Sequence, residues 1–251
     1  MNNDYYIMLD QVTYSYPSGG FHLNAGNLGL SSGRITFFCG ENGSGKTTLG
    51  KLISGIYKPD FGSVRITGIE TTRLTLGEIG RMVGYLWQNC EQQLFARTVL
   101  EELLFVRRLK RMGASKSPNL SVMLHQQNAH LPRVNSADDE DAEERAMDWL
   151  RYFGIDKYAQ SSSIRLSKGE KQRLALAAVL DAGAGYLILD EPTTGLDDGN
   201  KQILTDLLAK LREVDNIGMA IISHDSAFTR SLAERIVTLA AGEVISDENI
   251  N

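Results

Sequence analysis

A glycine-rich segment, Gly40–Thr48, carries residues that could hold a polyphosphate. It reads GENGSGKTT and fits the spacing G-x-x-x-x-G-K-[ST]. The fixed positions are Gly40, Gly45, Lys46 and Thr47. A turn rich in glycine can aim successive backbone N–H groups into one concavity, where they meet phosphate oxygens. We expect Lys46 to contact the β- and γ-phosphates and the Thr47 hydroxyl to ligate Mg²⁺.

The sequence on either side supplies the elements that such a loop needs. Ile35–Cys39 is a β-prone apolar run before the glycines, and Thr47–Ser54 has helical spacing after them. The N-terminus of a helix adds a positive dipole end to an anion site. A strand, a glycine loop and a helix start together favour phosphate binding over a purely structural turn.

A second segment, Gly185–Glu191, is an apolar run that ends in two carboxylates. Such runs are typical of buried parallel strands, and ligands collect beyond the carboxyl ends of these strands. We expect Asp190 to hold Mg²⁺ through water and Glu191 to act as general base on the attacking water. A strand followed by an acidic turn is the alternative, which the glycine loop makes less favoured.

With a third motif, these segments resemble the nucleotide-binding subunit of an ATP-binding cassette (ABC) transporter over nearly the whole chain. Leu166–Glu170 reads LSKGE and resembles the signature usually written LSGGQ, and Lys171–Leu174 continues it. This motif separates the family from other phosphate-loop proteins. The resemblance implies an α/β fold with a P-loop NTPase core, in which helices flank a mixed, mostly parallel sheet. It also implies an antiparallel β subdomain and an inserted helical signature subdomain.

Smaller motifs follow in the family's order, and the resemblance gives each a role. Gln88 resembles the Q-loop glutamine that senses magnesium, water and γ-phosphate, and His224 the switch histidine at the γ-phosphate. Asp197 resembles the D-loop aspartate that contacts a partner across a dimer. Tyr16 resembles the aromatic residue that stacks on adenine, but Tyr14 competes because strand alternation would put both rings on one face.

These assignments give three sets of site residues. The expected ATP-binding residues are Tyr16, Gly40, Asn42, Gly43, Ser44, Gly45, Lys46, Thr47 and Thr48. The expected catalytic residues are Glu191, His224 and Gln88. The expected magnesium ligands are Thr47, Gln88 and Asp190.

The signature implies a second ABC ATPase subunit, identical or different, because in the family it closes over the ATP of the opposite domain. The residues expected there are Ser167, Lys168, Gly169 and Glu170. Lys168 stands where the family usually has glycine. If that position needs a positive φ, lysine is strained, although its ammonium could also add a contact to phosphate.

The composition limits the partners. The net charge of the 251-residue chain is −5, which gives no basic footprint for nucleic acid. Cys39 and Cys90 lack metal or redox spacing, as expected in a reducing compartment. No signal peptide opens the sequence, and no apolar run reaches the roughly 18 residues that span a bilayer. We therefore expect a peripheral protein that reaches the cytoplasmic face of the cell membrane through a partner.

We expect one ABC ATPase domain over residues 1–251. Its nucleotide-binding core, with the β subdomain, is predicted at 4–88 and 185–246, and a helical subdomain at 90–180. Residues 113–136 are polar and irregular and are predicted to be an insertion.

Three features lie in or around the predicted helical subdomain. Val99–Arg108 and Ala142–Tyr152 have helical spacing. The acidic run Asp138–Asp141 suits a helix start, where carboxylates complement the dipole. His125 and His130, five positions apart, do not share a helical face and do not favour a metal site.

One stretch resembles a particular branch of the family. Gln88–Phe95 and Thr98–Glu102 resemble the Q-N-P-E-x-Q-L-F and T-V-E-E-E stretches of energy-coupling-factor importers, among them cobalt, nickel and biotin systems, with Cys90 in place of the proline. The resemblance implies an integral membrane subunit that contacts the region near Gln88–Phe95. The sequence ends soon after Gly242–Val244, so the C-terminal dimer-forming extension of some of these ATPases is expected to be missing.

Two other functions stay open at this point. A soluble ABC ATPase acting on ribosomes or DNA would usually show two cassettes, long coiled coils or zinc-binding insertions, which we do not find in the sequence. A subunit that gates without turnover would be favoured if Glu191 or His224 were replaced, and both are intact. The pattern therefore favours an ATP-hydrolysing subunit that powers transport across a membrane.

Overall fold

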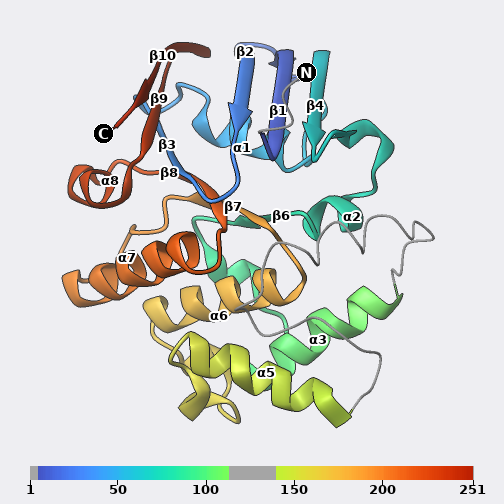
Figure 1. Ribbon diagram of the computed structural model, residues 1–251, viewed down its shortest axis with the longest axis vertical. Helices are drawn as coiled ribbons and strands as arrows, with labels where there is room; N and C mark the ends of the chain where they lie inside the picture. Colours follow the sequence, from blue (N-terminus) through green and yellow to red (C-terminus); the bar gives the residue numbers. More distant parts are fainter. Residues whose placement is uncertain (1–4, 113–139, 251) are drawn as a thin grey trace.

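A computed structural model of the protein describes residues 5–112 and 140–250 (Figure 1). The strands are β1 (Ile7–Ser15), β2 (His22–Leu30), β3 (Ile35–Cys39), β4 (Phe61–Ile66), β5 (Ile69–Glu70), β6 (Val83–Leu86), β7 (Tyr186–Asp190), β8 (Gly218–Ile222), β9 (Arg235–Ala240) and β10 (Glu243–Asn249). The helices are α1 (Lys46–Ile53), α2 (Leu76–Gly80), α3 (Val99–Met112), α5 (Glu140–Tyr152), α6 (Lys168–Asp181), α7 (Asp198–Glu213) and α8 (Ser226–Leu232). Short 3-10 helices are η1 (Thr71–Arg73), η2 (Cys90–Gln93), η3 (Asp156–Tyr158) and η4 (Ser163–Arg165).

The strands form one sheet in the order β5-β4-β1-β2-β10-β9-β3-β8-β7-β6. Strands β9, β3, β8, β7 and β6 pair in parallel, whereas β5, β4, β1 and β2 pair antiparallel. Strand β10 joins the two parts: it runs antiparallel to β9 and meets β2 in a parallel pair at Glu243 and Asn24. The expected mixed sheet flanked by helices is confirmed, and α3, α5 and α6 lie together below it in Figure 1.

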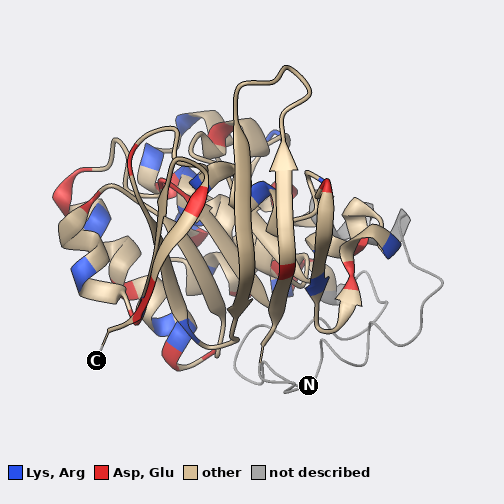
Figure 2. Ribbon diagram, turned by 90° about the horizontal axis from the view of Figure 1, so that it is seen from above, with Lys and Arg blue, Asp and Glu red and all other residues tan. Residues whose placement is uncertain are grey.

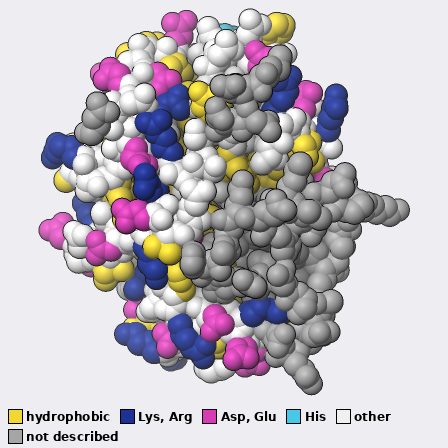
Figure 3. Space-filling model, viewed as in Figure 1, with side chains coloured by type: hydrophobic (Ala, Val, Ile, Leu, Met, Phe, Trp, Pro, Cys, Tyr) yellow, Lys and Arg dark blue, Asp and Glu magenta, His cyan; other side chains and the backbone are white. Residues whose placement is uncertain are grey.

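Positions of Lys and Arg and positions of Asp and Glu are interspersed along the ribbon in Figure 2. On the face shown in Figure 3, outside the grey atoms, Lys and Arg side chains alternate with Asp and Glu side chains. That face therefore has no extended field of one sign.

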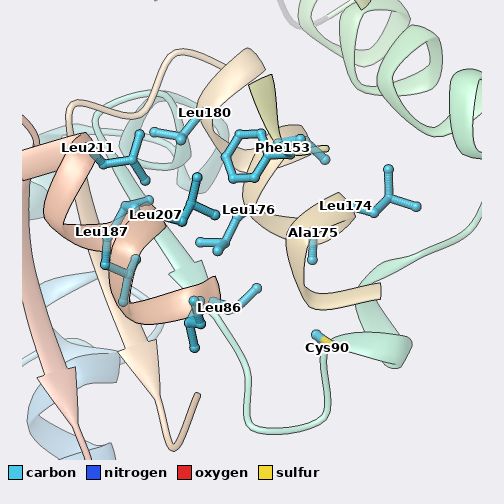
Figure 4. Packing of buried hydrophobic residues seen from close by; sticks show 14 of the residues in the cluster. Leu86, Cys90, Phe153, Leu174, Ala175, Leu176, Leu180, Leu187, Leu207 and Leu211 are labelled. Carbon is cyan, nitrogen blue, oxygen red and sulfur yellow. The ribbon is translucent and has the colours of Figure 1, made fainter. Parts of the chain in front are cut away.

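Both faces of the parallel strands are buried, because successive side chains alternate between them. On one face, Leu187 and Leu189 of β7 belong to a core with α6 and α7, whose leucines interdigitate in Figure 4. On the other face, Ile188 belongs to a core with α1 and with strands β1, β2 and β4. Helix α1 thus has the parallel strands on one side and the antiparallel strands on the other, which fixes the loop that precedes it.

The predicted helices at 99–108 and 142–152 are confirmed as α3 and α5. The described part of α5 begins at Glu140, within the acidic run. The predicted insertion at 113–136, with His125 and His130, lies outside the described residues. Among the helices that the structure describes, none combines the length and the apolar character needed to cross a membrane.

Candidate active site

A cavity of about 530 Å³ lies beyond the carboxyl ends of the parallel strands. Its lining residues are Tyr16, Phe21, Asn42, Gly43, Gly45, Lys46, Thr47, Thr48, Gln88, Asp190, Glu191, Thr194, Ile222 and His224. Sequence analysis did not select Phe21, Thr194 or Ile222. Thr194 opens the stretch Thr194–Asp197 that resembles the D-loop, and Ile222 opens the stretch Ile222–Asp225 that resembles the switch-histidine loop, whereas Phe21 carried no signal.

The glycine loop wraps around the Lys46 side chain. The ammonium Nζ donates to the carbonyl oxygens of Gly40 and Glu41, at 2.8 Å each. Burial lowers the pKa of Lys46, and the nearby Glu191 carboxylate opposes that shift. At Gly40 an added Cβ would lie 2.1 Å from the Leu239 carbonyl oxygen, and Gly45, with φ of +107°, turns the chain into α1. Glycine is therefore required at both positions.

Two donors fix the Asp190 carboxylate at the end of β7. The Thr47 hydroxyl donates to Oδ1 at 3.2 Å, and the Tyr85 hydroxyl donates to Oδ2 at 2.8 Å. Gln88 lines the same cavity. Hydroxyl, carboxylate and amide oxygens are hard ligands of the kind that Mg²⁺ prefers, so the donor set fits the expected metal. Tyr85 was not among the residues selected from the sequence.

Glu191 and His224 face each other across the cavity. His224 Nε2 lies 3.1 Å from Glu191 Oε1. Glu191 has a φ of +50°, an uncommon conformation for a residue with a Cβ, and its backbone N–H donates to the Ile222 carbonyl oxygen at 2.9 Å. The Glu191 side chain is 15% exposed, and its Oε1 is fully buried. The backbone hydrogen bond to Ile222 fixes the position from which the side chain enters the cavity.

The structure separates the two tyrosines that competed for the adenine position. Tyr14 is 8% exposed and stacks on Tyr57, with ring centroids 5.1 Å apart. Tyr16 lies just beyond the end of β1, so strand alternation no longer sets its direction, and it lines the cavity. Its hydroxyl is 2.8 Å from the Thr48 hydroxyl, and its ring centroid is 6.1 Å from that of Phe21.

The signature residues start helix α6 and do not line the cavity. Ser167 is the N-cap, and its hydroxyl and the Glu170 side chain form a capping box. Lys168 is the first helical residue and has no positive φ, so lysine causes no backbone strain there. Its Nζ lies over Gly195, where an added Cβ would be only 2.7 Å away. Lysine is therefore compatible with this backbone.

Three other expected site residues also lie outside the lining. Gly40 and Ser44 belong to the glycine loop but do not line the cavity. The Ser44 hydroxyl oxygen lies 3.4 Å from Lys46 Nζ. Asp197 is the N-cap of α7 and accepts the Asn200 backbone N–H at 2.8 Å, which lowers the pKa of its carboxyl. With the signature, Asp197 is thus part of the chain's outer surface and not of its own cavity.

Two large apolar side chains are exposed on neighbouring segments. Phe95 is 74% exposed and Ile164 is 82% exposed. The segments that carry Phe95 and Ile164 are linked by a hydrogen bond, which the Ser163 hydroxyl donates to the Ala96 carbonyl oxygen at 3.3 Å. We call Phe95 and Ile164 the Phe95 surface. Ile164 was not singled out from the sequence.

Comparisons with known proteins identify the family of the chain. The family model described as ABC transporter matches residues 23–194. An energy-coupling factor transporter ATP-binding protein, EcfA1 of Mycoplasma mobile, is 32% identical over 241 residues, which are 96% of this chain and 78% of that protein. The structure of CbiO1 from Clostridium perfringens, part of the ABC transporter complex CbiONQ, superposes with a TM-score of 0.79 at 25% identity and covers 98% of this chain and 89% of its own. A dimeric post-hydrolysis state of the ATP-binding cassette MJ0796, bound to ADP and Pi, has a TM-score of 0.74 at 27% identity, with 98% and 99% covered.

Proposed function

Because the chain belongs to the ABC transporter family and is an ABC ATPase, we propose that it powers an importer of the energy-coupling-factor type. In this proposal it is a peripheral subunit at the cytoplasmic face of the cell membrane and pairs with a second ABC ATPase. The observation that carries ATP hydrolysis in this proposal is the cavity in which the glycine loop, the Asp190 carboxylate and the Glu191–His224 pair meet.

Each lining residue has a chemical task in this proposal. The loop N–H groups and Lys46 bind the β- and γ-phosphates, and Tyr16 stacks on adenine. Thr47, Gln88 and Asp190 would hold Mg²⁺, which when bound offsets the phosphate charge. Glu191 orients the attacking water and accepts its proton, and His224 contacts the γ-phosphate and keeps the carboxylate in place.

The partner residues follow from the same proposal. The signature, Ser167–Glu170, and Asp197 act on the ATP of the second subunit, which is consistent with their position outside the chain's own cavity. The Phe95 surface receives the integral membrane subunit, because exposed apolar side chains of this size suit a buried protein interface. The Q-N-x-E-x-Q-L-F stretch and the similarity to EcfA1 and CbiO1 support the importer branch.

The test is affinity isolation of the tagged protein from gently solubilised native membranes, followed by mass spectrometry. An integral membrane protein with a second ATPase or a small substrate-binding membrane protein is the expected result. Recovery from the soluble fraction with ribosomal or DNA-repair proteins would replace the proposal with the soluble alternative.

A further inference from the structure

Tyr85 lies in strand β6, just before Gln88, and its hydroxyl contacts the Asp190 carboxylate. In the parallel register Tyr85 lies opposite Ile188, so its side chain is on the sheet face of Asp190, two residues further along β7. There its hydroxyl donates to Asp190 Oδ2 at 2.8 Å, while Thr47 holds Oδ1. The ring fits beside α1, where an added Cβ on Gly50 would lie 3.3 Å from Tyr85 Cε2.

The Tyr85 hydroxyl is shielded from solvent. Tyr85 is 9% exposed. An ionised carboxylate can only accept hydrogen bonds, and the Tyr85 O–H supplies one donor to it at 2.8 Å.

Gln93 holds the backbone on either side of this tyrosine. Its amide Nε2 donates to the Tyr85 carbonyl oxygen at 2.8 Å, and its Oε1 accepts the Trp87 N–H at 2.9 Å. Gln93 lies in η2. Hydrogen bonds thus link Gln93 through Tyr85 to Asp190, and Phe95 follows Gln93 two positions along the chain.

We propose that Tyr85 is a positioning residue for the magnesium-binding carboxylate and that Gln93 fixes the strand end from which Tyr85 acts. The inference rests on the proposed function, because it takes Asp190 as a metal-binding residue. Tyr85 holds Oδ2 and thereby fixes the direction of Oδ1, the oxygen on the side of Thr47, the other expected metal ligand. Removal of such an outer partner typically weakens metal binding about 10- to 100-fold.

The experiment measures ADP affinity with Mn²⁺ and with EDTA, and the ratio of the two is the metal contribution. Tyr85→Phe should lower this ratio by roughly tenfold while ADP affinity in EDTA stays unchanged. Tyr6→Phe is the matched control, because it also removes a buried hydroxyl bond, to the Met82 carbonyl oxygen at 3.1 Å, away from the cavity. It should keep the wild-type ratio.

One further variant, Asp190→Asn, separates the possible failures. If Asp190→Asn loses the metal contribution and Tyr85→Phe keeps it, the inference is overturned and the metal site stands. If Asp190→Asn keeps it as well, the metal assignment of the proposed function falls and the inference with it.

Gln93 is half-buried and lies outside the hydrophobic core, so it gives a second test of the same chain of hydrogen bonds. Gln93→Ala should reduce the metal contribution in the same direction as Tyr85→Phe, and the double variant should lose less than the sum, because the residues act in one chain. Gln92→Ala, at an exposed neighbouring position, is the control. Additive losses, or an equal loss in Gln92→Ala, would overturn the role of Gln93.

Discussion

His224 Nε2 lies 3.1 Å from Glu191 Oε1, although the two residues come from different strand ends. The register of β7 and β8 brings them together, because Asp190 pairs with Ile222. Glu191 directly follows Asp190, and His224 lies two positions after Ile222. The contact is therefore set by the rigid centre of the sheet, as a water-positioning pair requires.

Glu191→Gln should retain ATP binding and lose steady-state hydrolysis by on the order of 10²-fold or more, because the amide cannot accept the proton of the attacking water. Phosphate release and equilibrium ATP binding measure the two effects. Glu213→Gln, at an exposed position of α7, is the control. Turnover like that of the wild type in Glu191→Gln would refute the general-base assignment.

Lys46→Ala should weaken ATP binding roughly tenfold or more, since a charge-assisted contact to phosphate is lost. Because burial lowers the pKa of Lys46 from 10.5, wild-type affinity should also fall with rising pH before that value is reached. Equilibrium dialysis at several pH values tests both statements, with Lys58→Ala, at an exposed position, as control. Unchanged affinity in Lys46→Ala would count against the loop's role.

Lys168→Glu tests whether Lys168 acts on the partner's ATP, separately from its place at the start of helix α6. An acid at the first position of α6 suits the helix dipole, so thermal stability should not fall. A carboxylate facing the partner's γ-phosphate should nevertheless suppress ATP-dependent dimers, measured by light scattering in the Glu191→Gln background. Lys168→Gln, which is neutral, should dimerise more than Lys168→Glu. Equal dimerisation of the two variants would contradict the expected position of the signature.

Asp225→Ala should destabilise the fold by about 1 kcal/mol, because Asp225 caps α8 through the Ala227 and Phe228 N–H groups. The hydrogen bond from Lys201 holds the pKa of Asp225 below 3.8. Its stabilising contribution is therefore complete at neutral pH and is lost as the pH falls through the folded-state pKa.

Denaturant unfolding between neutral and acid pH measures the Asp225 effect. Asp225→Asn should keep most of the cap but lose the acid-dependent part. If the free energy of unfolding falls as steeply toward acid pH in Asp225→Asn as in the wild type, other carboxylates dominate the acid dependence.

Phe95→Asp should leave ATP binding unchanged and abolish recovery of the membrane partner, because a carboxylate would be buried in an apolar interface. Co-purification from membranes measures the loss. Ile245→Asp is the control, since Ile245 is a 61% exposed apolar residue on β10, outside the Phe95 surface. Recovery of the partner by Phe95→Asp would place the docking site elsewhere.

Local patterns predicted much of the fold. Ile35–Cys39 and the run into Asp190 were recognised as strands because buried parallel strands are continuous apolar runs. The glycine loop was predicted because all the residues of its motif lie together in one short stretch of the sequence. Most of the residues expected in the cavity do line it.

Contacts that depend on register could not be predicted in the same way. Tyr85 and Asp190 meet only because β6 and β7 pair with Tyr85 opposite Ile188, and a shift of one residue would turn the tyrosine to the other face. Ile164 joins Phe95 through segments far apart in the sequence. Tyr16 was preferred to Tyr14 by resemblance alone, because strand alternation put both rings on one face until the structure showed that β1 ends at Ser15.

Gln93 has a second consequence, for self-association. β6 is the last strand in the described sheet, and the open edge of a parallel sheet is a template for pairing with another chain. The Gln93 amide occupies one carbonyl and one N–H of that edge, at Tyr85 and Trp87. The chain thus caps its own sheet with a side chain, and loss of this cap would favour edge-to-edge aggregation during folding.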